Sequence, residues 1–549
     1  MNWQTSTRVA LLFFVVSLVI RVIGIGWGLP SSQNIASFHP DEPVNWAVTQ
    51  QVDPLKGDLD PGFYNYGTAF FAINHLVNDV VDALGMGATD PSVATVGQQA
   101  NEIAAGRFIS AVCGSILVSI TFLILFGRVH LIGACFGAAA VMVAPGLVMH
   151  SRFLTPDVMA AMFVTLSLYS GILASESPAM KHWVWAGICA GLAAGTKYNG
   201  ILALAGLLPA LIAIQRSEIP KRFGVALGCA LLTFVVSTPG VFINTAQFSK
   251  DFSYELWHTS AGHGLVFAGT SPGYIAHLAN IAVAFGTLLL LLSVCGTVLA
   301  IRDRLKWMSG LLAFALLYYL LIGKAELKFV RYVFPLLPVL AVLVGAIVAK
   351  AHTAANTKWR GVVAIAILGT FGVFGGGVMD TTRATMLMNE KDIRITIADQ
   401  LKSNGRGKSV GLVADPWFYT PALFPESSAP RYVPFKFREE ARLSAQNPSV
   451  LRFVPPNPDE RIDWDVRLLT EYKPDTIVFS SFETEGYERL AVQTPDDPRV
   501  APFLDFTKRL KEQYDLEKVY ASPIPPLHDM MYVRPTYYLW TRKNNSSNP

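Results

Sequence analysis

The sequence predicts a multi-pass α-helical membrane protein that carries a soluble α/β domain at its C-terminal end. Of its 549 residues, 52% are hydrophobic and only 15% are charged, whereas about a quarter of an ordinary soluble domain is charged. Long apolar runs recur along the first two thirds of the chain, and a helix needs roughly 20 apolar residues to cross a bilayer. The net charge of +4 is not gathered into a basic cluster, so we expect no nucleic-acid partner.

About eleven apolar runs, separated by charged breaks, are expected to cross the membrane. They cover residues 9–29, 103–126, 131–149, 157–174, 183–197, 200–215, 223–245, 274–301, 307–323, 330–349 and 361–379. If the N-terminus is cytoplasmic, the cytoplasmic connections hold far more Lys and Arg than the opposite short loops. This positive-inside bias predicts an integral cell-membrane protein with a cytoplasmic N-terminus and an extracytoplasmic C-terminal domain.

These spans divide the chain into a transmembrane module, residues 1–380, and an extracytoplasmic α/β domain, residues 381–549. Two connections within the module, residues 31–102 and 244–273, are long and are expected on the same extracytoplasmic side. The first contains an amphipathic stretch, residues 66–84. We expect it to form a helix that lies flat in the membrane interface.

The C-terminal region alternates a helical pattern with strand-like ones. Residues 390–405 have the helical pattern, and residues 409–416, 474–481 and 537–543 are short strand-like runs. The region carries neither a phosphate-binding loop nor a dinucleotide fingerprint. A small α/β domain that does not use a nucleotide is therefore expected.

Ionisable residues gather at the ends of the spans that are expected to face outward. They are Asp41, Glu42, Arg152, Asp157, Lys197, Lys324, Glu326, Lys328 and Arg331. The cations among them run against the positive-inside bias, and ionisable groups at membrane depth often mark function. Lys and Arg can bind the phosphate of a lipid-linked sugar, and a carboxylate can take the proton of an attacking hydroxyl. The set is therefore suited to glycosyl transfer from a lipid phosphate.

Each of these residues also has a structural explanation. In "HPDEP", Pro40 suits the first position of a helix, and carboxylates are favourable at a helix N-terminus. In "TPD", Thr155 could cap a helix whose first turn contains Asp157, and Arg152 is close enough in sequence to pair with that carboxylate. Lys197 could extend to the interface from a helix end, and Lys324, Lys328 and Arg331 could bind anionic lipid headgroups. The coincidence of all the charges on one side favours the functional interpretation.

Aromatic and histidine side chains in the outer loops are further candidates for substrate contact. Tyr64 and Tyr66 lie in the turn-rich stretch "DPGFYNYG", where tyrosines either stack on a sugar or anchor the loop at the interface. His258 and His263 are five residues apart, which is not the spacing of neighbours on a helix face, and with His39 they match no metal-ligand motif. Packing within the loops is the favoured explanation for these histidines.

Four stretches, in this order, resemble the GT-C-fold glycosyltransferases. Within that fold they look like the protein O-mannosyltransferase-like group, which also includes the lipid A aminoarabinose transferases. The stretches are "FHPDEP", "RFLTPDVMAAMFVTLSLY", "GLAAGTKYNGIL" and "KFVRYVFPLLPVL". The resemblance extends to about residue 380. The C-terminal region departs from the family, because it does not look like the β-trefoil insert of the eukaryotic protein mannosyltransferases.

The resemblance implies an inverting glycosyltransferase. Its donor would be a polyprenyl-phosphate-linked monosaccharide and its acceptor a hydroxyl of a protein, lipid or glycan, among membrane lipids. It maps the base onto Asp41 and the acidic residue of the fourth span onto Asp157, and it maps cations onto Lys197 and Arg331. The expected catalytic residues are Asp41, Glu42 and Asp157. The expected substrate-binding residues are Arg152, Lys197, Tyr198, Lys328, Arg331, Tyr64, Tyr66 and His263.

Three alternatives remain open at this stage. A transporter or flippase for lipid-linked sugars would favour repeats and charges near the membrane midplane, and a noncatalytic scaffold would use its outer domain to bind partners. A divalent metal is possible, because Asp41, Glu42 and Asp157 could supply oxygen ligands. Apart from such a metal, no cofactor is expected, and the sequence contains no metal-ligand motif.

Overall fold

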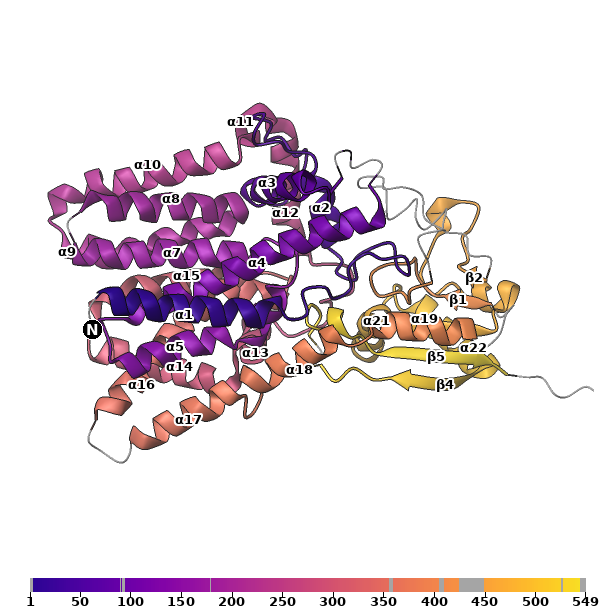
Figure 1. Cartoon of the computed structure of the whole chain (residues 1–549). Helices are drawn as coiled ribbons and strands as arrows, with labels where there is room; N and C mark the ends of the chain where they lie inside the picture. The colour runs from indigo at the N-terminus through magenta and orange to yellow at the C-terminus, as the bar shows by residue number, and fades with distance from the viewer. Residues whose placement is uncertain are drawn as a thin grey trace, which may run out of the picture.

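A helical bundle with an α/β domain at one of its ends forms the protein (Figure 1). This computed structural model describes residues 3–88, 90, 94–177, 179–354, 359–403, 409–423, 449–524 and 527–543. Six of its helices are long and apolar enough to cross a membrane, and a bent pair of helices adds a seventh candidate span. The predicted fold class, a multi-pass helical membrane protein with a C-terminal α/β domain, is confirmed.

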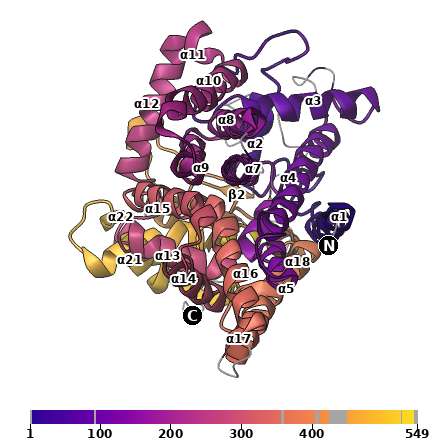
Figure 2. The same cartoon turned by 90° about the vertical axis from the view of Figure 1, so that its left-hand side faces the viewer.

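The bundle is built from the following helices, seen end-on in Figure 2. They are α1 (Trp3–Val22), α4 (Val96–Leu125), α5 (Leu131–Met142), α6 (Pro145–His150), α7 (Asp157–Glu176), α8 (Met180–Thr196), the 3₁₀ helix η2 (Tyr198–Leu207), α9 (Leu208–Ala213), the 3₁₀ helix η3 (Arg216–Glu218), α10 (Ile219–Ser237), α13 (Gly273–Phe285), α14 (Thr287–Arg302), the 3₁₀ helix η4 (Lys306–Met308), α15 (Ser309–Gly323), the 3₁₀ helix η5 (Val330–Leu336), α16 (Leu337–Thr353) and α17 (Arg360–Phe371). Each of the eleven expected spans coincides with at least one of these helices.

Several of the expected spans are shorter or more broken than the hydropathy suggests. The first helix ends at Val22, and a glycine-rich turn follows it. The third is split into α5 and α6 at Pro145, because proline removes a backbone donor and cannot continue a helix. The expected eighth span is not straight, since the chain bends by 111° between α13 and α14. Gly286 forms the corner with φ +120°, a conformation that glycine adopts easily.

Shorter helices cover the end of the bundle that faces the α/β domain. They are α2 (Glu42–Thr49), α3 (Ala69–Ala83), α11 (Gly240–Ile243) and α12 (Thr245–Ala261). α3 is seen end-on in Figure 1 and lengthwise in Figure 2, so it runs across the bundle axis as expected for residues 66–84. α12 is a helix in the second long loop that the sequence analysis did not predict.

The C-terminal domain contains one five-stranded mixed sheet in the order β2-β1-β3-β5-β4. Its elements, entered through α18 (Gly377–Asn389), are α19 (Ile393–Ser403), β1 (Val410–Leu412), β2 (Val450–Leu451), the short helical turns η8 (Pro458–Glu460) and η9 (Leu468–Tyr472), β3 (Thr476–Ser480), α21 (Ser481–Gln493), α22 (Ala501–Gln513), β4 (Tyr514–Tyr520), η10 (Met531–Val533) and β5 (Tyr537–Arg542). β1 pairs in parallel with β2 and β3, whereas β5 is antiparallel to β3 and β4. Three of the strands and α19 lie where the sequence predicts them; residues 404 and 405 of the expected helix lie outside the described part of the chain.

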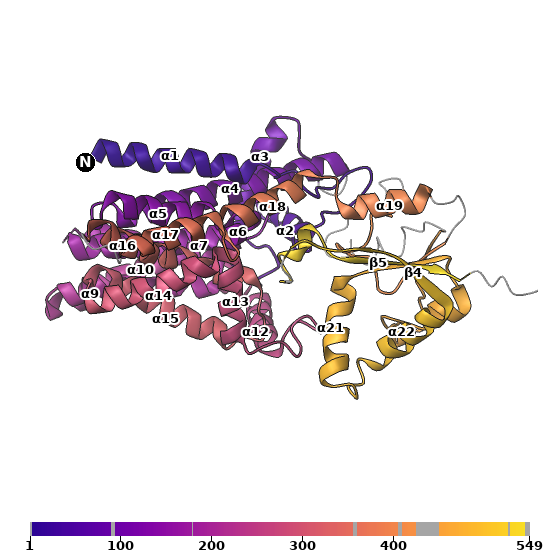
Figure 3. The same ribbon diagram turned by 90° about the horizontal axis from the view of Figure 1, so that it is seen from below.

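The sheet is covered on both faces, with α19 on one side and α21 and α22 on the other (Figure 3). Alternation along β3 explains this arrangement, because successive side chains of a strand point to opposite faces. Ile477 and Phe479 pack in the same core as α22. Val478 packs with Leu539 and α19 in a core that continues into the helical bundle. The domain and the bundle therefore share one hydrophobic core at their junction.

Candidate active site

Two ion pairs bring together four charged residues that are far apart in the sequence. The guanidinium of Arg331, in η5, lies 3.4 Å from the carboxylate of Asp41, which precedes α2. The ammonium of Lys197, between α8 and η2, lies 2.6 Å from the carboxylate of Asp157, the first residue of α7. All four residues lie where the bundle meets the α/β domain. The structure thus brings together four of the acids and cations that the sequence placed on one side.

Asp41 and Glu42 are adjacent but occupy different environments. The side chain of Asp41 is 29% exposed, whereas that of Glu42 is fully buried. Arg107 donates to both Glu42 oxygens at 2.7 and 2.6 Å, and the backbone N–H of Leu154 donates to one of them at 2.8 Å. Only Asp41 has an open approach for a substrate. The contacts of Glu42 favour a structural role, in which it ties the first outer loop to the loop before α7.

The charge state of this neighbourhood follows from burial and from the guanidiniums. Burial raises the pKa of Glu42, but the attraction and hydrogen bonds of Arg107, together with the effects of His39 and Ser37, outweigh it, so the pKa lies below its ordinary value. Burial lowers the pKa of His39 to about 4, so this ring is neutral at physiological pH. Its Nδ1 accepts a hydrogen bond from the backbone N–H of Asp41 at 3.2 Å. His39 therefore orients the backbone at Asp41 as a neutral group.

The local structure around Asp157 differs from the helix cap that the sequence suggests. α7 begins at Asp157 itself and has Pro156 at its cap position. Thr155 makes no capping hydrogen bond, and its hydroxyl is buried without a partner among the described residues. The helix begins at Glu42 rather than at Pro40 in the first outer loop as well, with Pro43 in its first turn. The expected cap at Thr155 and the expected first helical position at Pro40 were therefore wrong.

Arg152 is buried but does not pair with Asp157. It donates to the backbone carbonyl oxygens of Ile20 and Arg21, at the end of α1, at 2.9 and 3.3 Å. It also donates to the hydroxyl of Thr385 in α18 at 2.8 Å. Arg152 therefore joins three segments of the fold, and Lys197 takes the place beside Asp157. As a substrate-binding residue, Arg152 stays a prediction without direct contact to the ion pairs.

Aromatic rings surround the two cations. The Lys197 ammonium lies 5.1 Å from the ring centre of Tyr332 and 5.8 Å from that of Tyr66. The Arg331 guanidinium lies 4.1 Å from the ring centre of Phe329. Burial and the neighbouring Asp41 hold the pKa of Tyr66 well above its ordinary value. Tyr66 is therefore a neutral hydroxyl group that lies close to both ion pairs.

Other expected substrate-binding residues make contacts that organise the loops. Tyr64 is buried and donates to Asp60, and the hydroxyl of Tyr198 donates to the carbonyl oxygens of Tyr64 and Tyr66 at 2.7 and 3.1 Å. Tyr198 thus holds the turn that presents Tyr66. The two tyrosines therefore occupy different places: Tyr66 lies beside the ion pairs, and Tyr64 packs inside the loop.

Lys328 and His263 lie at the border of the second long loop. The ammonium of Lys328 contacts Thr270 at 3.1 Å and Glu326 at 3.0 Å rather than Asp41 or Asp157. A ring nitrogen of His263 is 2.9 Å from one of His258. These contacts link α12 and the loop that follows it to the segment leading to Arg331. Direct contact of Lys328 or His263 with substrate stays a prediction.

Four buried polar groups near the ion pairs have atoms without a hydrogen-bond partner among the described residues. They are Nε2 of His39, both ring nitrogens of His150, the Thr155 hydroxyl and Nη1 of Arg331. Buried polar atoms are almost always hydrogen-bonded, to protein or to water. A concentration of open donors and acceptors at one place is what a polar ligand or bound water would satisfy. It marks the region between Asp41 and Asp157 as a candidate binding region.

The site also contains residues that the sequence analysis did not identify. Arg107 is a lone arginine in a long apolar helix, a signal of function or pairing that could have been noticed. His150 lies in α6, shortly before Asp157. Asp529 and Tyr532 come from the α/β domain, and burial raises the pKa of both, while Arg331 acts in the opposite direction. No sequence pattern connects these two residues with the bundle.

The carboxylates are poorly arranged for a divalent metal. Each carboxylate already forms an ion pair: Glu42 with Arg107, Asp157 with Lys197 and Asp41 with Arg331. A cationic side chain beside a carboxylate disfavours binding of a metal cation there. Within the part of the chain that the structure describes, no group of three or more His, Cys, Asp or Glu side chains is placed to hold a metal ion. The residues present do not fit the metal-dependent alternative.

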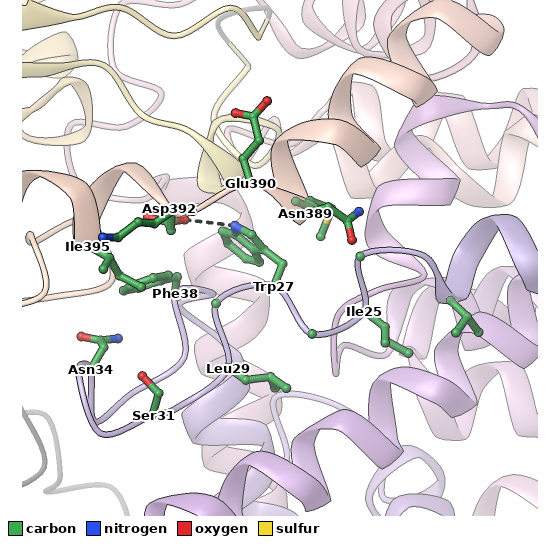
Figure 4. Close-up of a pocket in the computed structure, with 16 residues that line it drawn as sticks. Ile25, Trp27, Leu29, Ser31, Asn34, Phe38, Asn389, Glu390, Asp392 and Ile395 are labelled. Atoms are coloured by element: carbon green, nitrogen blue, oxygen red, sulfur yellow. Dashed lines mark hydrogen bonds between the residues drawn. The ribbon is translucent and has the colours of Figure 1, made fainter.

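A cavity of about 430 Å³ lies at a different place, between the end of α1 and the start of α19. Figure 4 shows its wall, in which the indole N–H of Trp27 donates to Asp392 at 3.0 Å. Phe38 also lines the cavity, but neither Asp41 nor Arg331 does. The cavity is therefore separate from the ion pairs, and the candidate active site is defined by its charges rather than by the size of a pocket.

Comparison with known proteins supports the sequence resemblance over part of the chain. Residues 96–242 match the family described as dolichyl-phosphate-mannose-protein mannosyltransferase. The matched segment runs from α4 to α11 and contains Asp157 and Lys197, whereas Asp41 and Arg331 lie outside it. The predicted resemblance to the glycosyltransferases of the protein O-mannosyltransferase-like group is confirmed by this match. A comparison with curated proteins gave no significant match.

The solved structures that match this chain are remote in sequence. The archaeal oligosaccharyltransferase AglB from Archaeoglobus fulgidus is 12% identical, with a TM-score of 0.49 over 100% of this chain and 75% of its own. ArnT from Cupriavidus metallidurans is 14% identical, with a TM-score of 0.48 over 97% of this chain and 98% of its own. The Pmt1-Pmt2 protein O-mannosyltransferase complex of S. cerevisiae is 18% identical, with a TM-score of 0.33 over 45% of this chain and 35% of that one.

Proposed function

We propose that the protein is an integral membrane glycosyltransferase that moves a monosaccharide from a polyprenyl-phosphate carrier to a hydroxyl acceptor. The observation that carries this proposal is the pairing of two acids with two cations, Asp41 with Arg331 and Asp157 with Lys197, in one charged cluster. The match of residues 96–242 to a family named for dolichyl-phosphate-mannose supports the class of donor. Both Asp157 and Lys197 belong to the matched segment.

Lys197 and Arg331 would bind the phosphate of the donor. A phosphate is a leaving group whose negative charge grows as the glycosidic bond breaks, and nearby cations stabilise that charge most where water is excluded. Arg331 has a buried Nη1 without a partner among the described residues, which is a donor available to a phosphate oxygen. The rings of Tyr332 and Phe329 beside the two cations reduce their hydration. Asp157 would hold Lys197 in place.

Asp41 would act as the general base. Its carboxylate takes the proton of the acceptor hydroxyl, the hydroxyl oxygen forms a bond to the anomeric carbon, and the bond from that carbon to the phosphate oxygen breaks. The electron pair of the broken bond stays on the lipid phosphate. Asp41 is the carboxylate of the expected catalytic three that is partly exposed. Access from the outer side would let an acceptor reach it.

Inversion at the anomeric carbon is the expected stereochemical outcome. Retention by double displacement needs a second carboxylate to act as nucleophile. Glu42 is fully buried beneath Arg107, and Asp157 is held by Lys197. With Asp41 as the base, neither of these acids is free to attack the sugar. A single displacement is the mechanism that the contacts support.

The site would face the extracytoplasmic side. The N-terminus and the α/β domain lie at opposite ends of the bundle (Figure 1), and the distribution of Lys and Arg among the loops favours a cytoplasmic N-terminus. The domain of residues 381–549 would then cover the site from outside, although α18 already crosses the boundary at residue 380. Single cysteines introduced at the exposed positions Lys391 and Arg302, at opposite ends of the bundle, would be labelled from one side of the membrane. The position that reacts from outside would decide this orientation.

The decisive experiment measures transfer by the purified protein in detergent with a panel of polyprenyl-phosphate sugars. Mass spectrometry identifies the product, and NMR of its anomeric configuration reports inversion or retention. Asp41→Asn should reduce turnover about 100- to 10,000-fold, while Asp53→Asn, at a partly exposed acid of the same loop paired with Lys56, should not. Full activity of Asp41→Asn would reject this assignment. A transporter would form no product in detergent, where no sealed bilayer exists.

A further inference from the structure

The α/β domain reaches the candidate active site through a short segment before its last strand. This segment, residues 527–533, includes η10 and places Asp529 against the start of η5. Asp529 is 1% exposed. One of its carboxylate oxygens accepts the backbone N–H of Val330 at 2.9 Å, and the other accepts that of Arg331 at 3.1 Å. A residue of the domain thus holds the backbone from which the Arg331 side chain extends.

The two hydrogen bonds constrain the direction in which Arg331 points. The first N–H groups of a helix have no partner within the helix, and a carboxylate that accepts two of them forms strong, charge-assisted bonds. Because both oxygens of Asp529 are used, the peptide planes at Val330 and Arg331 are fixed. The guanidinium then lies 3.4 Å from Asp41. The same carboxylate is 4.0 Å from Nε2 of His150, a buried ring near the ion pairs whose nitrogens have no hydrogen-bond partner among the described residues.

Aromatic packing holds the segment from both sides. The ring of His528 lies 5.5 Å from that of Phe329 in the bundle and 5.0 Å from that of Phe482 in α21. The ring of Tyr532 lies 5.0 Å from that of His39 beside Asp41. From within the domain, Arg394 donates to the Tyr532 carbonyl oxygen at 2.9 Å. The segment is therefore a rigid bridge between the sheet and the ion pairs.

Docking of the domain does not depend on Asp529 alone. In α21, Arg489 donates to the carbonyl oxygens of Ala268, Val266 and Leu265 at 2.6, 2.8 and 3.0 Å. The indole of Trp27 donates to Asp392 on the opposite side of the junction. These contacts anchor the domain to the bundle independently. Removal of the Asp529 charge should therefore disturb Arg331 while the domain stays in place.

We propose that Asp529 is a positioning residue for Arg331, so that the lipid-phosphate site is shared between the helical bundle and the α/β domain. This inference rests on the proposed function, in which Arg331 binds the phosphate of the donor. It gives the domain a role in the reaction centre itself, in addition to any contact with the acceptor. Asp529 touches neither the sugar nor the phosphate and acts through the backbone of η5.

A double-mutant cycle tests the proposal. Asp529→Asn, Arg331→Ala and the double variant are compared with wild type in two assays: binding of undecaprenyl phosphate in nanodiscs, and steady-state transfer. Asp529→Asn should weaken binding of the lipid phosphate and raise KM for the donor about 10- to 100-fold, the loss expected for a misplaced group. In the Arg331→Ala background Asp529→Asn should change neither quantity, because the guanidinium that Asp529 positions is already gone, although the backbone N–H groups remain. A merely structural defect would add its own loss there.

Asp475→Asn is the matched control, because Asp475 also accepts the backbone N–H and hydroxyl of one residue, Ser409, within the same domain. It should leave both assays at the wild-type level. Wild-type behaviour of Asp529→Asn, or an additive loss in the double variant, would overturn the proposal while the proposed function stands. If wild type binds the lipid phosphate without transferring sugar, the proposed function fails and the binding cycle still decides the role of Asp529. Absence of lipid-phosphate binding by wild type would overturn both.

Discussion

The guanidinium of Arg331 lies 3.4 Å from the carboxylate of Asp41. The two residues are far apart in the sequence, because Arg331 belongs to the tenth expected span and Asp41 to the loop after the first expected span. Arg331 is held by Asp529 through its backbone, and Asp41 is held by the neutral ring of His39. Each partner of the ion pair is thus oriented by a separate contact. A donor phosphate that enters between them would meet a cation and a base whose positions are already set.

Arg331→Lys should retain part of the donor affinity, and Arg331→Ala should lose more. Lysine keeps the charge but not the planar guanidinium, which can donate in parallel to two oxygens of a phosphate. We expect KM for the lipid-linked donor to rise with both variants, with the larger rise for alanine. Titration calorimetry with undecaprenyl phosphate measures the affinity directly. Equal affinity of all three proteins would exclude Arg331 from the phosphate site.

Glu42→Gln should destabilise the protein more than it alters the chemistry. The change leaves the fully buried Arg107 without its charged partner, and breaking a buried ion pair costs about 3–5 kcal/mol. Thermal unfolding in detergent reports this loss. Glu176→Gln is the control, because Glu176 forms an ion pair with Arg128 in which its side chain is 42% exposed. Exposed ion pairs contribute about 0–1 kcal/mol. An unchanged melting temperature with lost turnover would instead indicate a catalytic role for Glu42.

The stability of the protein should fall as the pH is lowered from about 6.5 to about 4, partly because of His39. Burial lowers the pKa of this ring to about 4, and an unfolded chain would have the ordinary pKa of about 6.5. Between these values the unfolded state binds more protons, so stability decreases as pH decreases. Above about pH 6.5 the contribution is fully present. Asp41 and Glu42 oppose the shift in pKa, whereas Arg331 and Arg107 reinforce it.

Replacement of His39 checks this pH dependence. His39→Asn keeps a neutral polar side chain that does not titrate, so the change in free energy of unfolding between pH 6.5 and pH 4 should become smaller. The expected difference is of order 3 kcal/mol for a shift of this size. Denaturant titrations at both pH values measure it. His528, whose pKa burial lowers to about 3, continues to titrate in the variant and contributes to the remaining slope in the same range. An unaltered slope would remove His39 from the explanation.

Lys197→Gln and Asp157→Asn should be coupled. Asp157→Asn removes the partner that holds the Lys197 ammonium at 2.6 Å, and Lys197→Gln removes the charge that would meet the phosphate. Each single variant should lower turnover, and the double variant should be less impaired than the product of the two losses. Steady-state kinetics on the four proteins measure the coupling. Independent, multiplicative effects would show that the two residues act separately.

Much of the fold could be predicted from the sequence, because crossing a bilayer requires long apolar runs and these are visible along the chain. The eleven expected positions are helical, and α19, β1, β3 and β5 lie where their patterns indicate. The corner at Gly286 could not be predicted. It lies within one continuous apolar run, and hydropathy does not report the direction of the backbone.

The sequence by itself determined which charged residues lie at one end of the bundle, since Asp41, Asp157, Lys197 and Arg331 each adjoin a recognisable span. Only the tertiary structure decided how they pair. Arg152 is closest to Asp157 in sequence, but Lys197 is its partner. The contribution of Asp529 was likewise decided by the docking of the domain. Position along a span is a local property of the chain, whereas an ion pair depends on the packing of segments that are distant in sequence.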